Sequence, residues 1–438
     1  MAPLSVRAKP VANRVLLYSP DVIGHPRVYC RVIADSLADA PITLIIALGF
    51  TDEVGLNESP DLQPLASRPG VQLVETRSYS MTGSTNLSAE ELINMQSRLE
   101  VDTTIFIEAE KSNIEFIRIA EGKAPQLKGR NLGIFANSCE WYPGEDGFTG
   151  ERRRLLAPTL RTTLGNIKRR IFDRKKSARH FFEKSIIGAG VLDEVWVKDE
   201  RLADWRGPPV YWMPEISRPT PVEETAAESA EFLRRAEELR SFLSENEGRE
   251  PVLYFGDAAY YKGYDLFLEF VASIPGACAI HAGRTYDQQQ RSYFRCDVEA
   301  IRTKLKEEGR LYETNDYVHT QRLKELYFGA IRVYLTTHRL ALSSSTIIQA
   351  LELGKPVLVP DRGLLGYRVR ANGLGQVYQY EDLSDLRRQA QALWQRDLRP
   401  YAASAKQYWQ RFSDDSIRVF FWSRLYSGGL NSRHPELH

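Results

Sequence analysis

Hydrophobic residues in the first half of the chain occur in short runs separated by amphipathic stretches. Residues 15–18 and 42–48 are predicted to form buried strands, and the hydrophobic spacing over 28–37 predicts a helix between them. Alternating strands and helices are typical of a doubly wound parallel sheet, which binds ligands at the carboxyl ends of its strands. The first turn at this edge contains one glycine, Gly24, so the glycine-rich fingerprint of a dinucleotide site is absent. Further strands are predicted at 71–75, 103–107, 132–135, 194–197 and 210–213.

The second half repeats this alternation. Residues 252–255 predict a strand, the loop 256–263 follows it, and hydrophobic residues over 266–270 predict the next helix. Another strand is predicted at 278–281, and two helices precede the short hydrophobic run at 333–335. The pattern predicts an α/β protein with two Rossmann-like domains that face each other across a cleft.

A run of four hydroxyl residues lies beyond 333–335. It opens a predicted helix that Gly354 ends, before another strand at 357–359. A helix that begins at the carboxyl end of a strand presents unpaired N–H groups and the positive end of its dipole. This arrangement predicts an anion site, although an ordinary serine-capped helix is the alternative interpretation. The run comprises Ser343, Ser344, Ser345 and Thr346.

Composition narrows the class of protein. The 438 residues suit two domains with a core each, and a net charge of +1 gives no general attraction to nucleic acid. No hydrophobic run reaches the roughly 18 residues of a membrane span, and the first residues lack a signal-peptide pattern. We therefore expect a cytoplasmic protein. Its cysteines have no metal-ligand spacing and are expected to be free thiols: Cys30, Cys139, Cys278 and Cys296.

Residues 151–184 are strongly basic. They contain 12 Arg or Lys against three acidic residues, and hydrophobic residues recur over 160–171 at helical spacing. Such a helix could contact an anionic membrane through 152–184, which would place the protein at the inner face of the membrane. Alternatively, its hydrophobic stripe packs on the domain and its charges are solvated. Aromatic residues do not interleave with the charges, so no nucleic-acid partner is predicted.

Lys262 is the main candidate cation of the second half. It lies in the loop 256–263 and would enter the cleft beside the helix that the hydroxyl run opens. A mobile ammonium next to a helix N-terminus suits a pyrophosphate. A solvated loop lysine is the alternative.

This layout resembles the retaining, nucleotide-sugar-dependent glycosyltransferases of GT-B fold, in particular the large family that contains sucrose synthase and bacterial mannosyltransferases. The loop 256–263 is similar to the family's glycine–arginine–x4–lysine–glycine loop, with Lys262 as the lysine. Residues 341–356 match its stretch of glutamate, seven residues and glutamate, followed by Ala-x3-Gly-x-Pro, and 346–356 is the most specific part. The turn 23–25 matches the glycine loop near the donor phosphates. The resemblance covers nearly the whole chain.

The resemblance implies different roles for different parts of the chain. Residues 1–217 would form an N-terminal acceptor-binding domain and 218–410 a nucleotide-sugar donor domain, while a helix within 411–438 would pack back on the first domain. The donor would be a nucleotide sugar, UDP- or GDP-sugar before others. No metal is expected, since no Asp-x-Asp motif is present. The acceptor would be a glycan, a lipid-linked group or a protein.

The resemblance also assigns roles to single residues. Lys262 would neutralise the donor diphosphate, and the hydroxyl run would bind it through hydroxyl and N–H groups. Gln349 stands where the family has the glutamate that holds the ribose hydroxyls, and its amide oxygen can still accept those bonds. The predicted nucleotide-binding set is Gly24, Gly256, Asp257, Lys262, Arg284, His338, Ser343, Ser344, Ser345, Thr346 and Gln349.

Three positions depart from the family pattern. Asp257 replaces the arginine of the donor loop, and Ala341 replaces the first glutamate, which in the family touches the transferred sugar. Residues 135–140, where the family's active-site histidine is expected, contain none. Candidates to compensate are His25, Arg284, His338 and Arg368.

In the catalytic step, the charge of the departing nucleoside diphosphate must be stabilised. Lys262 and the helix start could do this without a metal. In the family the anomeric configuration is retained, by same-face attack assisted by the departing phosphate. Glu140 is a candidate to accept the proton of the acceptor hydroxyl, or else a helix-capping acid, and His25 completes the predicted catalytic set.

We therefore predict a GT-B glycosyltransferase that transfers a sugar with retention, in bacterial glycan, glycolipid or glycoconjugate synthesis. The departures at Asp257 and Ala341 leave open a catalytically silent GT-B scaffold subunit of a glycosylation complex. A nucleotide-sugar epimerase of similar build ranks third, because its acid and base residues cannot be placed in the sequence.

Overall fold

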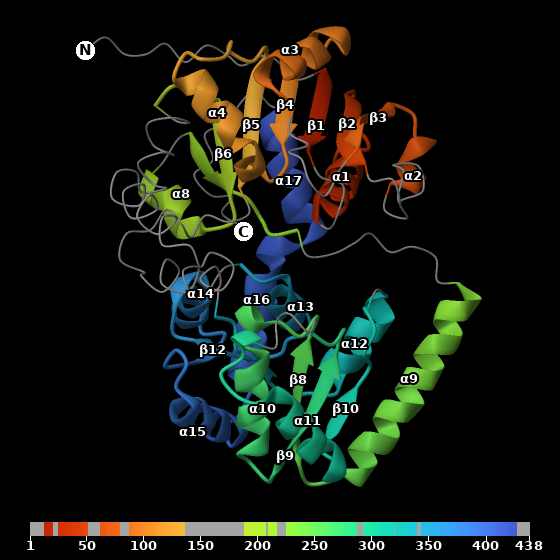
Figure 1. The fold of residues 1–438 in the computed structure, drawn as a ribbon, viewed down its shortest axis with the longest axis vertical. Coiled ribbons are helices and arrows are strands. Elements are labelled where there is room, and N and C mark those ends of the chain that lie inside the picture. Colours follow the sequence, from red (N-terminus) through yellow and green to blue (C-terminus); the bar gives the residue numbers. More distant parts are fainter. Residues whose placement is uncertain are drawn as a thin grey trace. The chain divides into compact units, whose positions relative to one another are not determined.

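The described residues of the computed structural model form two compact units (Figure 1). Unit 1 contains the described residues up to 135 together with 188–216 and 412–426, and unit 2 contains 225–411. Each unit has its own hydrophobic core. The structure describes residues 13–20, 25–50, 62–78, 87–135, 188–206, 209–216, 225–286, 292–318, 320–339 and 343–426.

The described part of unit 1 is built on a seven-stranded parallel sheet of order β3-β2-β1-β4-β5-β6-β7. Chain order reverses beside β1, the arrangement of a doubly wound sheet. Every strand that the hydrophobic pattern predicted in this half is present. The strands are β1 (Arg14–Ser19), β2 (Thr43–Phe50), β3 (Val71–Ser78), β4 (Thr103–Phe106), β5 (Arg130–Phe135), β6 (Glu194–Val197) and β7 (Val210–Trp212).

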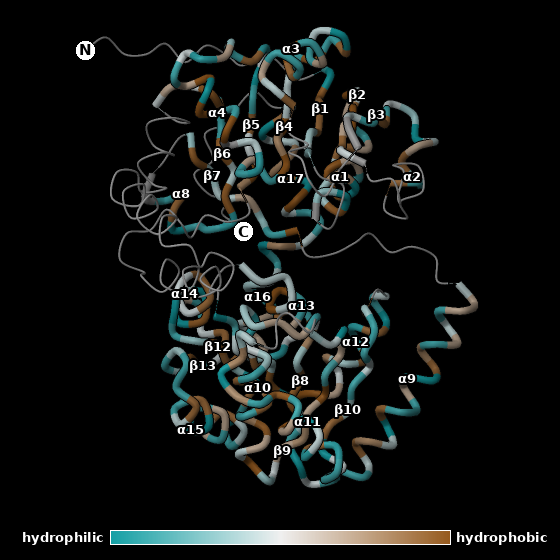
Figure 2. The backbone as a smooth tube through the Cα atoms, viewed as in Figure 1, coloured by the Kyte–Doolittle hydropathy of each residue, from teal (hydrophilic) through white to brown (hydrophobic). Residues whose placement is uncertain are grey.

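Helices cover both faces of this sheet, because successive strand residues point to opposite sides. Leu17 packs with α1 (His25–Ser36) and α17 (Asp414–Leu425), whereas Leu16 packs with α3 (Ala89–Arg98), α4 (Asn113–Ala120) and α8 (Glu200–Arg206). The short helix α2 (Gln63–Ala66) precedes β3. Hydrophobic residues are concentrated in the strands (Figure 2). Helix α3 begins with a capping box, since Ser88 accepts from the Glu91 amide and Glu91 accepts in return from the Ser88 amide.

The last described helix, α17, belongs to unit 1. The ring of Phe421 lies 5.8 Å from that of Trp196, and the Trp422 indole donates to the Ser36 carbonyl at 2.9 Å. Arg130 donates to the Arg424 carbonyl at 2.7 Å. Helix α17 therefore packs on elements from the first part of the chain.

Unit 2 contains two three-stranded parallel sheets among its described residues. One has the order β10-β9-β8 and the other β11-β12-β13, and β11 contacts β8. The strands are β8 (Glu250–Phe255), β9 (Ala277–Ala282), β10 (Leu311–Glu313), β11 (Tyr334–Leu335), β12 (Val357–Pro360) and β13 (Gly375–Tyr378). The helices are α9 (Ala226–Glu245), α10 (Tyr264–Ala272), α11 (Val298–Glu307), α12 (Gln321–Gly329), α13 (Ser345–Glu352), α14 (Gly363–Asn372), α15 (Leu383–Trp394) and α16 (Arg399–Trp409).

Candidate functional site

In the loop between β8 and α10, the side chain of Lys262 folds back over Gly256, the first residue of the loop. Gly256 has a φ of +100°, and a Cβ added there would lie 2.9 Å from the Lys262 Nζ atom. Gly263 has a φ of +70°, and a Cβ there would lie 2.0 Å from the Thr337 carbonyl oxygen. Both positions favour glycine because of their positive φ, and at Gly263 a side chain would also collide with the neighbouring backbone.

This loop is anchored to the segment that follows β11. The Thr337 hydroxyl donates to the carbonyls of Lys262 and Gly263 at 3.0 and 2.8 Å. The Arg339 amide donates to the Tyr261 carbonyl at 2.9 Å. The segment that Thr337 and Arg339 belong to leads on to the hydroxyl run and α13. The structure therefore brings the Lys262 loop against the approach to the predicted helix start.

Asp257 is paired with Arg284, which follows β9. The guanidinium donates to both carboxylate oxygens, with Nε at 3.0 Å from Oδ1 and Nη2 at 2.6 Å from Oδ2. These hydrogen bonds lower the pKa of Asp257 against the opposing effect of partial burial. The Arg284 side chain remains 60% exposed. The guanidinium of Arg284 thus lies beside residue 257, the position at which the family pattern has its loop arginine. It comes from the segment after β9 and not from the loop after β8.

Lys262 and His338 share one environment. Burial lowers the pKa of Lys262, the Asp257 carboxylate opposes that change, and Arg284 adds to it. Burial, followed by the charge of Lys262, lowers the pKa of His338 to about 3. The His338 Nδ1 atom contacts the Thr336 hydroxyl. At neutral pH, His338 is therefore an uncharged neighbour of the lysine, able to share hydrogen bonds but not to add positive charge.

The hydroxyl run surrounds the start of α13. Ser344 occupies the N-cap position, but its side chain makes no capping hydrogen bond. Its hydroxyl lies instead 2.9 Å from the Thr346 hydroxyl, which also accepts from Tyr334 at 2.9 Å. By contrast, the N-cap residues Thr225 and Ser413 cap their helices in the ordinary way. The N-terminus of α13 thus keeps its dipole without a side-chain cap.

Two further predicted residues lie near this helix start. Ser343 accepts a hydrogen bond from the Arg368 guanidinium at 3.1 Å, and Arg368 is 3% exposed. Gln349 is buried within α13 at 7% exposure. Lys262 thus lies in the loop that follows β8, and Arg368 is hydrogen-bonded to Ser343 in the segment that follows β11.

Most of the chain matches solved structures of glycosyltransferases at low sequence identity. Sucrose-phosphate synthase from Thermosynechococcus elongatus matches with a TM-score of 0.57 and 14% identity, over 94% of this chain and 98% of that chain. HepE from Anabaena, in complex with UDP, matches with 0.59 and 13%, over 94% and 99%. WaaG, a glycosyltransferase involved in lipopolysaccharide biosynthesis, matches with 0.54 and 13%, over 94% and 99%. No protein-family model and no curated protein sequence matches the chain.

The chain has the GT-B fold. At identities this low the likeness shows the arrangement of elements and leaves the roles of single residues untested. The GT-B architecture places the candidate residues of unit 2 at the carboxyl ends of parallel strands, the edge at which such sheets bind ligands.

Several predicted site residues lie outside the described residues or at their margin. Gly24, Glu140, Ala341 and the basic segment 152–184 fall outside the described ranges. His25 is the first residue of α1. Their predicted roles remain predictions.

Unit 1 contains a buried charged group that the sequence analysis did not single out. The Lys198 ammonium donates to Glu215 Oε1 at 3.1 Å, and the two side chains are 8% and 4% exposed. The ring centre of Tyr29 lies 5.4 Å from the same ammonium. Lys198 directly follows β6 and Glu215 follows β7. The sequence could have indicated this pair only through the charged residue that follows each of the two predicted strands.

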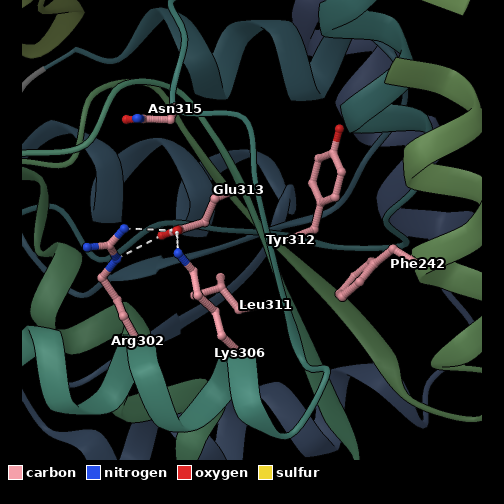
Figure 3. Close-up of a pocket in the computed structure, with 7 residues that line it drawn as sticks. All are labelled: Phe242, Arg302, Lys306, Leu311, Tyr312, Glu313 and Asn315. Atoms are coloured by element: carbon pink, nitrogen blue, oxygen red, sulfur yellow. Dashed lines mark hydrogen bonds and ion pairs between the residues drawn. The ribbon is translucent and has the colours of Figure 1, made fainter. Parts of the chain in front are cut away.

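A surface pocket of about 390 Å³ lies at the β10 edge of unit 2 (Figure 3). Arg302 and Lys306 both point to Glu313, at 2.9 and 2.7 Å, so the carboxylate already compensates these cations. Phe242 and Tyr312 line another side. None of the predicted nucleotide-binding residues lines this pocket.

The described ranges hold no group of three or more His, Cys, Asp or Glu side chains arranged to bind a metal ion. They also hold no helix with the length and hydrophobicity needed to cross a membrane.

An acid-sensitivity experiment tests the environment of His338. Below about pH 6.5 the unfolded chain protonates this histidine, whereas the folded chain does not until about pH 3, so stability falls as pH decreases. The loss attributable to His338 is expected to reach up to about 3 kcal/mol at pH 4. His338→Gln should remove that part of the pH dependence, measured by urea unfolding at pH 7 and pH 4. An unchanged difference between the two pH values would contradict the buried, neutral state.

Proposed function

We propose that this protein is a glycosyltransferase that moves a sugar from a nucleoside-diphosphate sugar, UDP- or GDP-sugar, to an acceptor hydroxyl. The observation that carries the proposal is the Lys262 loop, which is hydrogen-bonded to the segment leading into the uncapped start of α13. An ammonium and a helix N-terminus at one sheet edge suit a diphosphate. The GT-B fold supports the proposal, as does the UDP bound to the matched HepE structure.

The proposed reaction needs stabilisation of the leaving group above all. The bond between the anomeric carbon and the phosphate oxygen breaks, and the diphosphate takes the electron pair. Lys262 donates to a phosphate oxygen, the first N–H groups of α13 face another, and Ser344 and Thr346 supply hydroxyls. The acceptor oxygen attacks from the same face and its proton passes to the departing phosphate, so the configuration is retained. No metal takes part in this proposed route.

The roles of Asp257 and Arg284 follow from their pairing. Arg284 makes two hydrogen bonds to Asp257 and is largely exposed, so a diphosphate near Lys262 would meet a guanidinium whose position the carboxylate fixes. This pairing offsets the anion that Asp257 introduces into the family loop. Gln349 would hold the ribose hydroxyls, and neutral His338 would keep a single positive charge at Lys262.

Unit 2 is proposed to bind the donor and unit 1 the acceptor. The acceptor class is a glycan, a lipid-linked group or a protein, in bacterial glycan or glycoconjugate synthesis. We place the protein in the cytoplasm, with peripheral contact to the inner face of the membrane through 152–184.

A thermal-shift panel of UDP, GDP, ADP and dTDP tests the donor site. A nucleotide at 100 times its dissociation constant is expected to add about 2.7 kcal/mol to the unfolding free energy. Stabilisation by UDP or GDP, with the corresponding nucleoside much weaker, would support the proposal. No stabilisation by any of the four would contradict it.

A catalytically silent binding subunit is the second candidate, because the bidentate pair with Asp257 neutralises Arg284 and Ala341 replaces a sugar-contacting glutamate. Release of free nucleoside diphosphate from a nucleotide sugar, when acceptor is added, separates the two. Binding without release would favour the subunit.

Membrane contact is tested with vesicles. Reversing the charges of Lys168, Arg169, Arg170, Lys175 and Lys176 is expected to weaken binding to vesicles that contain 30% anionic lipid by more than about 100-fold, because each basic residue near the surface contributes about 1 kcal/mol. Vesicles of neutral lipid are the control. Unchanged partitioning would remove the membrane from the proposal.

A further inference from the structure

We infer that Arg339 is a positioning residue that holds the loop 256–263 and thereby fixes the place of the Lys262 ammonium. The inference rests on the proposed function, because it concerns how the donor diphosphate site is held in shape. Arg339 lies four positions before Ser343, the start of the hydroxyl run, and its sequence context predicted no role for it.

Arg339 is almost completely enclosed by partners. Its side chain is 1% exposed and that of Asp265 is 0% exposed. The guanidinium donates to both oxygens of Asp265, at 2.7 and 2.9 Å, and through Nε to Glu381 at 2.7 Å. It also lies 4.1 Å from the centre of the Tyr260 ring. A buried arginine with such fixed geometry is a rigid point in the unit.

The contacts of Arg339 and Thr337 cover four consecutive carbonyls of the loop. Arg339 Nη1 donates to the Tyr260 carbonyl at 2.7 Å, and the Arg339 amide donates to the Tyr261 carbonyl at 2.9 Å. The Thr337 hydroxyl donates to the carbonyls of Lys262 and Gly263. Each peptide group from 260 to 263 is therefore held by the segment 337–339.

Such a clamp is needed because the loop has little structure of its own. Residues Tyr260–Lys262 form one turn of 3-10 helix, and so short a helix has no independent stability. The Lys262 amine must also lie over Gly256 in a partly dehydrated place, which its lowered pKa reflects. A change in the backbone at Tyr260 or Tyr261 would move the amine away from a diphosphate.

Arg339 also joins three parts of unit 2. Asp265 lies in the first turn of α10, and Glu381, with a φ of +58°, lies between β13 and α15. Arg339 itself lies between β11 and α13. The guanidinium therefore sets the spacing between the Lys262 loop and the segment that carries the hydroxyl run, which is the spacing that a bound diphosphate would have to match.

Arg310 provides a matched control. It is also a buried arginine of unit 2, at 5% exposure, and it too donates to backbone carbonyls, those of Ala277 at 2.9 Å and of Val271 and Ile274 at 2.6 Å. It precedes β10 and contacts the first residue of β9, so it lies at the amino ends of these strands, away from the Lys262 loop. Lysine at either position keeps the charge and loses the planar fork.

The test compares Arg339→Lys and Arg310→Lys in the full chain, each alone and combined with Lys262→Ala. Calorimetric titration with UDP, GDP, uridine and guanosine gives the affinities, and thermal unfolding gives the stabilities.

Arg339→Lys is expected to weaken binding of the preferred nucleoside diphosphate by about tenfold and binding of its nucleoside by less than about twofold. Arg339→Lys combined with Lys262→Ala should bind no more weakly than Lys262→Ala alone, within about twofold. Arg310→Lys should lower the melting temperature comparably and leave both affinities unchanged.

The outcomes separate this inference from the proposed function. Additive losses in the double variant, or equal losses for diphosphate and nucleoside, would overturn the inference while leaving a Lys262-dependent donor site in place. If the unaltered protein binds neither UDP nor GDP, the proposed function falls and the inference with it. Should Arg339→Lys fail to fold, Glu381→Gln removes the negative charge of one partner of the guanidinium, at a side chain 28% exposed, and a smaller loss of about threefold, again selective for the diphosphate, is expected.

Discussion

Replacing Lys262 by Ala is expected to lower kcat/KM for sugar transfer by about 10²–10³-fold, the usual effect of removing one fixed donor to a developing negative charge. The lysine is folded over Gly256, and the backbone around it is hydrogen-bonded to Thr337. The backbone that carries its ammonium is therefore held in place before the substrate arrives. The same variant should weaken binding of the nucleoside diphosphate far more than binding of the nucleoside.

Lys355→Ala is the control for this variant. Lys355 is another lysine of unit 2 whose pKa burial lowers, and its amine donates to the Ile331 carbonyl at 2.7 Å just before β12. It should cost stability without a selective effect on the diphosphate. Calorimetric titration and an assay of released nucleoside diphosphate measure the two variants. Equal losses of diphosphate and nucleoside affinity in Lys262→Ala would refute the role of the lysine.

The hydrophobic pattern was sufficient for most of the fold, because long buried strands and amphipathic helices are each specified locally. The strand before the hydroxyl run, the helix after it and its end at Gly354, with a φ of +65°, were predicted and are confirmed. Elements with weak local patterns were missed. β10 has only three residues. β13 begins at Gly375, where a Cβ would lie 1.9 Å from the Val357 carbonyl oxygen, so a glycine stands where a hydrophobic residue would have marked the strand.

The candidate site was less predictable, since it depends on contacts between distant residues. Lys262 could be proposed from its own loop, but its link to Thr337 spans 75 positions of sequence. The pairing of Asp257 with Arg284 was not visible either, although both residues were named. A buried arginine such as Arg339 carries no periodic pattern, so its role follows only from the partners that surround it.

Replacing Lys198 by Met is expected to lower the free energy of unfolding by about 3–5 kcal/mol, the typical cost of leaving one partner of a buried ion pair uncompensated. Burial opposes the charged form of Lys198, but Glu215 and Tyr29 together outweigh it and raise the pKa of the lysine. Without the ammonium, the Glu215 carboxylate would remain charged, at 4% exposure, against hydrophobic surroundings. Urea unfolding at pH 7 measures the loss.

The pH dependence and a double variant distinguish this cause from loss of packing. Without Lys198, part of the lost stability should return as pH falls from 7 towards 5, because a lower pH favours the neutral form of an uncompensated buried carboxylate. Lys198→Met with Glu215→Leu should regain most of the stability, because a well-packed hydrophobic pair can replace a buried ion pair. Lys123→Met, which breaks the exposed pair with Glu121 in the same unit, should cost less than about 1 kcal/mol. A Lys198→Met protein that is no less stable than Lys123→Met would show that the charges after β6 and β7 do not form the pair in solution.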